Sequence, residues 1–156
     1  MVKPFGPYVS GQPLYMRDDF IDGLKCLRSD DYEGALLLFR AADECAEIDD
    51  IYQSRYTSFH GLSRVYMGDS SGVKLCRKAV VGEIRDAEVY YNLAMAEHRL
   101  NFHESALTAL RRGMNVDPHH AGLLRLQRVL SPKSRLGAGA NGLVKQLLGR
   151  LLGHSV

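Results

Sequence analysis

The feature that most constrains this chain is an internal repeat with a spacing of 34 residues. Aromatic, small and apolar residues recur at that interval, and the basic pair Arg111-Arg112 follows Arg77-Lys78 at the same distance. The earlier copy has Tyr56, Phe59, Gly72 and Cys76 where the later copy has Tyr90, Leu93, Ala106 and Leu110. Repeats of about 20–50 residues indicate arrays whose units bury their apolar faces against their neighbours. We therefore expect one stack of similar units.

The later copy resembles a complete unit of the tetratricopeptide repeat family, whose period is about 34 residues. The residues at the spacing of that family's signature are Tyr90, Leu93, Ala94, Ala106, Leu110 and Pro118. A third, degenerate copy lies upstream, at Gly23, Cys26, Ala35, Phe39 and Ala42. The resemblance implies an all-α fold, a helix-turn-helix superhelix of three repeats with a capping helix and a C-terminal amphipathic helix.

Turn and capping signals predict the boundaries. Proline and glycine in residues 1–13 indicate an extended lead-in, and residues 14–130 form the repeat domain. Its parts are expected at 16–49, 53–86 and 87–120, with the capping helix at 118–130. Gly68 suits a left-handed cap, Asp86 an N-cap, and Asp117-Pro118 a helix start. The helices are predicted at about 14–28, 32–45, 51–66, 71–81, 87–100, 103–115 and 118–130.

Composition and charge bound the class of protein. The amino-terminal residues contain no apolar run that predicts secretion, and no stretch is long enough to span a bilayer, so we expect a cytoplasmic protein. The three cysteines are interpreted as small buried hydrophobes of a reducing compartment. Residues 1–50 hold 5 Lys/Arg against 11 Asp/Glu, net −6, whereas residues 111–156 hold 8 against 1, net +7. The two ends can attract each other between molecules, or simply keep the protein soluble.

Small residues at the points of helix approach, such as Gly23, Gly72 and Ala106, are interpreted as structural. The resemblance further implies a concave groove, lined by the first helix of each repeat, that holds a peptide or a helix of another protein. By register, the predicted groove residues are Arg17, Phe20, Leu24, Leu27, Arg28, Thr57, Arg64, Tyr91, Met95, His98 and Arg99, with Ser54, Gly61, Val65 and Glu88 beside them. The predicted function is a noncatalytic protein–protein interaction module that acts as an adaptor, a scaffold or a chaperone-like protein.

The family members that grip chaperone carboxyl termini need Lys, Asn and Arg at defined groove points. This chain agrees at Asn92 alone and has Phe20, Leu24, Ser58 and Glu88 at four other points. A chaperone-tail co-chaperone is therefore disfavoured. A secretion-type chaperone, which resembles this chain in its three-repeat size, stays as an alternative.

The sequence contains no pattern that predicts catalysis, a cofactor or a metal. His98 and His103 are five residues apart across a helix boundary, and no cysteine or carboxylate completes a ligand set. His60 is interpreted as a satisfied interior histidine, and His119 and His120 as surface residues. Basic residues cluster near the carboxyl end, but Phe102 is the only aromatic residue after Tyr91, so nucleic-acid binding is disfavoured.

The last segment has a different pattern. Residues 131–142 are predicted to be a flexible linker, and 143–153 an amphipathic tail helix. Its apolar stripe consists of Leu143, Val144, Leu147, Leu148, Leu151 and Leu152. Soluble monomers avoid such exposed stripes, so the tail is predicted to dock on an apolar surface, in cis or in a homodimer. The alternative from another class is peripheral association of the basic carboxyl-terminal end with an anionic membrane surface, which would be weak, or with nucleic acid.

Overall fold

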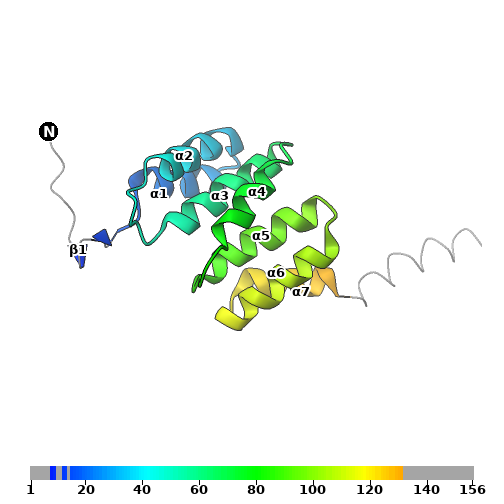
Figure 1. Cartoon of the computed structure of the whole chain (residues 1–156). Coiled ribbons are helices and arrows are strands. Elements are labelled where there is room, and N and C mark those ends of the chain that lie inside the picture. The colour runs from blue at the N-terminus through cyan, green and yellow to red at the C-terminus, as the bar shows by residue number, and fades with distance from the viewer. Residues whose placement is uncertain (1–7, 10–11, 14, 132–156) are drawn as a thin grey trace, which may run out of the picture.

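The computed structural model describes residues 8–9, 12–13 and 15–131, which are all-α apart from one short strand pair (Figure 1). Strands β1 (Tyr8–Val9) and β2 (Gln12–Pro13) pair antiparallel within the predicted lead-in. The helices are α1 (Asp18–Arg28), α2 (Tyr32–Glu44), α3 (Gln53–Tyr66), α4 (Gly72–Ala79), α5 (Ala87–Arg99), α6 (His103–Val116) and α7 (Ala121–Leu130). Among the described residues, no helix is both long and apolar enough to cross a lipid bilayer.

Consecutive helices pack as hairpins. α1 contacts α2, α3 contacts α4, and α5 contacts α6. Contacts of α3 with α2 and α5 join these hairpins into one stack, and α7 covers the last hairpin by packing on α6 and α5 (Figure 1). The seven helices predicted within 14–130 are thus present, in the predicted order, in the described part of the chain.

The turns within the hairpins need backbone conformations that few residues adopt. Gly68 follows α3 with a φ of 89°, which confirms the predicted left-handed cap. Asn101 adopts a φ of 64° after α5, and Asp30 a φ of 58° after α1. Asparagine and aspartate tolerate this region best after glycine, because their short polar side chains bond locally. Each of the three hairpins therefore turns at a residue with a positive φ.

Helix starts depend on capping acceptors. The Asp31 carboxylate accepts from the Gly34 amide, and the Asp86 carboxylate accepts from the Glu88 amide, so the predicted cap at Asp86 is confirmed. α1 begins at Asp18, later than the predicted Leu14.

The predicted helix start at Asp117-Pro118 is wrong. The Asp117 carboxylate accepts from the His119 amide and closes a local turn instead. α7 begins at Ala121, where the imidazole of His120 accepts from the Leu123 amide.

The first hydrophobic cluster is aromatic. Phe20 of α1 contacts Phe39 of α2 and Tyr56 and Phe59 of α3, with ring centroids 5.1–5.4 Å apart. Gly23 lies directly under Phe39, because a β-carbon there would approach within 2.7 Å of that ring. The cluster fastens α3 to the first hairpin.

The second cluster is aliphatic and allows closer helix approach. It extends over α3 to α7 and includes Cys76, Ala94, Ala106 and Leu123, all fully buried. A methyl group at Gly72 would collide with the carbonyl oxygen of Gly61, so α3 and α4 pack backbone against backbone. The structural interpretation of these small residues is confirmed.

Candidate functional site

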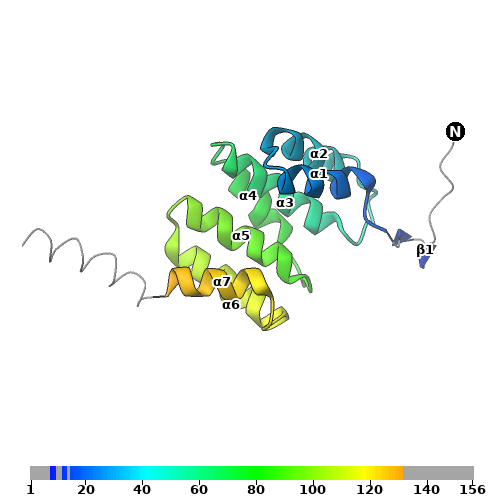
Figure 2. The ribbon, with the colours of Figure 1, turned by 180° about the vertical axis from the view of Figure 1, so that it is seen from behind.

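α1, α3, α5 and α7 share one side of the stack (Figure 2). On this side a mainly apolar groove is lined by residues of α1, α3 and α5, with Tyr32 from the start of α2. The groove has a volume of about 360 Å³, within the ~300–1,000 Å³ typical of ligand pockets. Its lining residues are Leu27, Tyr32, Phe59, Leu62, Ser63, Tyr66, Glu88, Tyr91 and Asn92.

Tyr66 and Tyr91 form the aromatic wall of this groove. The guanidinium of Arg99 lies 4.5 Å from the ring centroid of Tyr66, which orients both side chains by a cation–π contact. Burial raises the pKa of the Tyr91 hydroxyl, and the nearby Tyr66 and Glu88 raise it further. Tyr91 therefore offers a neutral, amphipathic surface to the groove at physiological pH.

His120, just before α7, contacts two residues that line the groove, Tyr91 and Glu88. Its ring centroid is 5.6 Å from that of Tyr91, and its Nε2 is 2.9 Å from a carboxylate oxygen of Glu88. Because Nδ1 accepts from the Leu123 amide, the proton of the neutral ring is assigned to Nε2, which donates to Glu88. A single imidazole thus caps α7 and fixes a groove carboxylate, although the sequence interpretation treated it as a surface residue.

The structure brings only part of the predicted groove set together. Leu27 and Tyr91 line the groove, and Arg99 borders it through Tyr66. Leu24 and Met95 are half-buried against the two hydrophobic clusters.

The other predicted residues of α1 and α5 have different surroundings. Phe20 is buried in the aromatic cluster, and Arg17 donates to the Cys45 carbonyl oxygen, so neither faces a partner. The exposed Arg28 donates to the Leu24 carbonyl oxygen. His98 lies at the α5–α6 turn, its ring centroid 6.1 Å from that of His103.

The predicted groove residues of α3 lie on other sides of that helix. Thr57 is buried and donates to Asp43 of α2, whereas Arg64 pairs with Asp69 and bonds Ser71 beside α4. Gly61 faces α4, and Val65 is buried.

The reason is a one-residue difference between repeats. The positive-φ turn residues Gly68 and Asn101 are 33 residues apart, although Gly72 and Ala106 are 34 apart. One residue in an α-helix corresponds to a rotation of roughly 100°. A 33-residue offset relates Met95 to Leu62 and Arg99 to Tyr66. Leu62 and Tyr66, with Phe59 and Ser63, form the groove face of α3 that the 34-residue register missed. The 33-residue spacing of Gly68 and Asn101 was the sequence signal for this offset.

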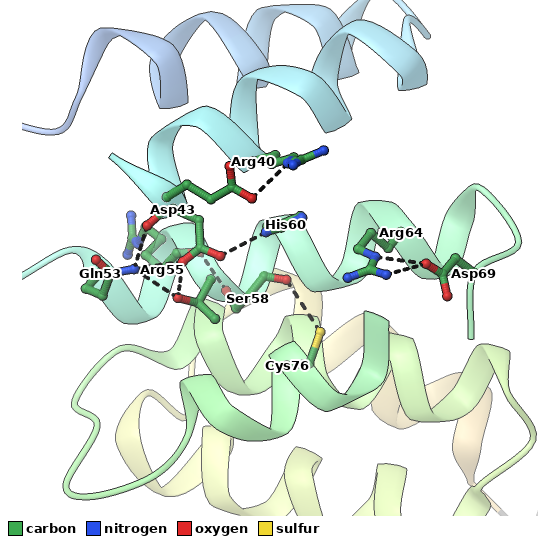
Figure 3. A network of polar contacts seen from close by, with 11 residues as sticks. Arg40, Asp43, Gln53, Arg55, Ser58, His60, Arg64, Asp69 and Cys76 are labelled. Carbon is green, nitrogen blue, oxygen red and sulfur yellow. Dashed lines mark hydrogen bonds and ion pairs between the residues drawn. The ribbon is translucent and has the colours of Figure 1, made fainter. Parts of the chain in front are cut away.

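A buried polar network occupies the opposite side of α3 (Figure 3). The Asp43 carboxylate of α2 accepts from Thr57 and Gln53 and lies 2.8 Å from His60 Nδ1. Burial alone would raise the pKa of Asp43, but hydrogen bonds from His60 and Thr57 outweigh it and hold that pKa below its ordinary value. The interpretation of His60 as a satisfied interior histidine is confirmed.

A second chain of polar contacts joins the hairpins. The Ser58 hydroxyl donates to the Arg55 carbonyl oxygen and accepts from the Asn92 amide, while the Cys76 thiol donates to the Ser58 carbonyl oxygen at 3.5 Å. Both polar networks therefore bond neighbouring helices to one another. In the described part of the sequence, no cluster of three or more His, Cys, Asp or Glu side chains is suited to hold a metal ion.

A larger and more polar hollow, of about 620 Å³, lies along the loops between hairpins. Arg55 of α3 spans it with two bonds to the Asp86 carboxylate, at 2.6 and 2.9 Å. That carboxylate also caps α5, so the pair ties consecutive hairpins together.

The tail residues Leu143, Val144, Leu147, Leu148, Leu151 and Leu152 lie outside the described residues.

No protein-family model and no curated protein matches this chain.

Proposed function

We propose that this protein is a noncatalytic binding module of the tetratricopeptide type, which holds a segment of another protein in the groove between α1, α3 and α5. The proposal is supported by three consecutive helical hairpins with a period of 33–34 residues and by small residues where those hairpins approach most closely. Adaptor, scaffold and chaperone-like roles all use such a groove.

The observation that carries the proposal is the chemistry of the groove lining. Leu27, Leu62, Tyr66 and Tyr91 are only partly buried, yet they form one continuous apolar surface on one side of the stack. A surface of this kind fits a short helix or an extended segment with two or three apolar side chains. Glu88, at the same surface, can pair with a basic group of that segment.

The polar groups that resemble catalytic pairs support a binding role, because each has a structural task. Asp43 orients Thr57 and His60 between α2 and α3, and Glu88 holds the His120 ring that caps α7. We place the protein in the cytoplasm as part of this proposal, since Cys26, Cys45 and Cys76 are all free thiols.

The test is selection from a displayed library of random peptides, followed by calorimetric affinity measurement. Enriched peptides should share apolar positions, and Leu62→Ala, Tyr91→Ala should weaken their binding by roughly 10-fold or more, because each lost anchor costs about 1 kcal/mol or more. Leu37→Ala is the matched control, since Leu37 is 67% exposed on α2, outside the groove. Equal affinity of the two variants would remove the groove from the mechanism.

A further inference from the structure

The groove is mainly apolar and half-exposed, α7 packs on α5 beside it, and the chain continues from that helix. We propose that residues 143–152 of the same molecule occupy the groove as an autoinhibitory helix until a partner displaces them. This inference rests on the proposed function of the groove and adds its regulation.

α7 begins beside the groove. Gly122, in the first turn of α7, touches Tyr91 of the groove, since a β-carbon there would be 2.9 Å from the Tyr91 ring. α7 has ten residues, so its far end lies about 15 Å from that contact. Residues 133–142 can span roughly 30 Å when extended. The linker is therefore long enough to return residue 143 to the groove, whatever direction it takes from Leu130.

The apolar residues of the tail have the spacing of helix anchors. The sequence places Leu143, Leu147 and Leu151 four residues apart, and Val144, Leu148 and Leu152 run parallel to them. Side chains at i, i+4 and i+8 stand on one face of a helix, which is the pattern of helix-in-groove recognition. The groove offers a matching series of apolar side chains, one from the first helix of each hairpin: Leu27 of α1, Leu62 of α3 and Tyr91 of α5.

The tail and the α1–α2 turn carry opposite charges. At the α1–α2 turn, beside the groove residue Tyr32, the side chains of Asp30, Asp31 and Glu33 are exposed. Lys145 and Arg150 lie between the tail's apolar positions. Opposite charges steer and orient a docking segment more than they add affinity. The basic residues of the tail should thus point towards the α1–α2 turn, away from Arg99.

The experiment uses the full chain with a photo-crosslinking amino acid at position 147 and mass-spectrometric mapping of the products. The expected result is crosslinks to residues 59–66 and 88–95 within one molecule, with a yield that does not change over a hundredfold range of protein concentration. Crosslinker at position 134, in the linker, is the matched control and should give few products in the groove.

Crosslinks from position 147 to another face of the fold, or products that join two molecules and increase with concentration, would overturn the proposal. A crosslinking yield that is unchanged in the double variant Leu62→Ala, Tyr91→Ala would also overturn it.

A second measurement separates this result from the proposed function. Leu147→Asp, Leu148→Asp should raise the affinity for library-selected peptides by roughly 10-fold, as expected when about 90% of the grooves are occupied in cis. If the tail crosslinks to the groove and this variant still enriches no peptide, the autoinhibitory helix becomes a permanent structural element and external binding is wrong. If peptides bind both forms equally and position 147 makes no groove crosslink, external binding stands and the tail proposal fails.

Discussion

The two sides of α3 use opposite chemistry. Towards α2 and α4 the helix buries hydrogen-bonded polar groups and one glycine, with Thr57 and His60 on Asp43 and Gly61 against Gly72. Towards α1 and α5 it presents Leu62 and Tyr66, which are apolar or amphipathic and half-exposed.

This contrast distinguishes the residues of α3 that fix its packing from those that remain available to a ligand. Buried polar groups with complete hydrogen bonds specify how helices pack. Partly exposed apolar groups on a concave surface remain available to a ligand. The packed side of α3 should therefore respond to substitution through stability, and the groove side through binding.

The largest expected effect concerns Cys76, which lies between α4 and α3. Burial, together with the nearby Glu97 carboxylate, raises the pKa of the Cys76 thiol to about 12. Three pKa units correspond to roughly 1,000-fold less thiolate at neutral pH. Maleimide labelling of Cys76 in the native protein, followed by peptide mapping, should be slower than in the urea-unfolded chain by at least that factor. Comparable rates would mean that the packed side of α3 is open.

The next effect in size is overpacking at the α3–α4 contact. Gly72→Val places a branched side chain against the Gly61 backbone, which cannot move without parting the helices, so unfolding should cost about 3 kcal/mol less. Lys74→Val is the matched control, because Lys74 is exposed on the same helix and the change costs only about 0.5 kcal/mol of helix propensity. Urea unfolding measures both. Similar losses in the two variants would contradict the close approach.

A smaller loss is expected at the polar network. Asp43→Ala leaves Thr57 and His60 without their shared acceptor, and an unsatisfied buried group costs about 1–3 kcal/mol. The same urea titration at pH 7 should show a loss in this range. The exposed pair of Arg40 and Glu44 on α2 is the comparison, and Glu44→Ala should change stability by under about 1 kcal/mol.

The smallest predicted effect is the pH dependence of that network. The pKa of Asp43 is lower in the folded state than its ordinary value, so its contribution to stability is present above the unfolded pKa of about 3.9. It is lost as the pH falls through the lower folded value. The stability difference between wild type and Asp43→Asn should therefore shrink between pH 5 and pH 2. A difference that is constant over this range would mean that the carboxylate charge is not involved.

Particular residues show how far the sequence could be interpreted. Cap signals such as Asp86 and Gly68 depend on the local backbone, and the structure confirms both. The groove face of α3 depends on the relative rotation of two helices, which a 34-residue match conceals. Tyr56 and Tyr90 anchor that match, yet Tyr56 accepts from the Arg17 amide while Tyr90 lies under the Arg112 guanidinium. The same residue type thus has two different environments.

The start of α7 escaped prediction for a different reason. Aspartate followed by proline is a strong start signal, and histidine is a rare N-cap. His120 takes that position because Glu88, 32 residues away in the chain, holds its ring. A contact of this kind depends on tertiary packing and leaves no local signal.

The central claim, that the groove binds a polypeptide segment, is tested most directly by NMR chemical-shift mapping with a library-selected peptide. The account predicts that the backbone amides of Leu27, Leu62, Tyr66 and Tyr91 shift in saturable fashion, while those of Leu37 and Arg40 on α2 do not. Shifts concentrated on the α2 and α4 side, or spread evenly over the stack, would contradict it.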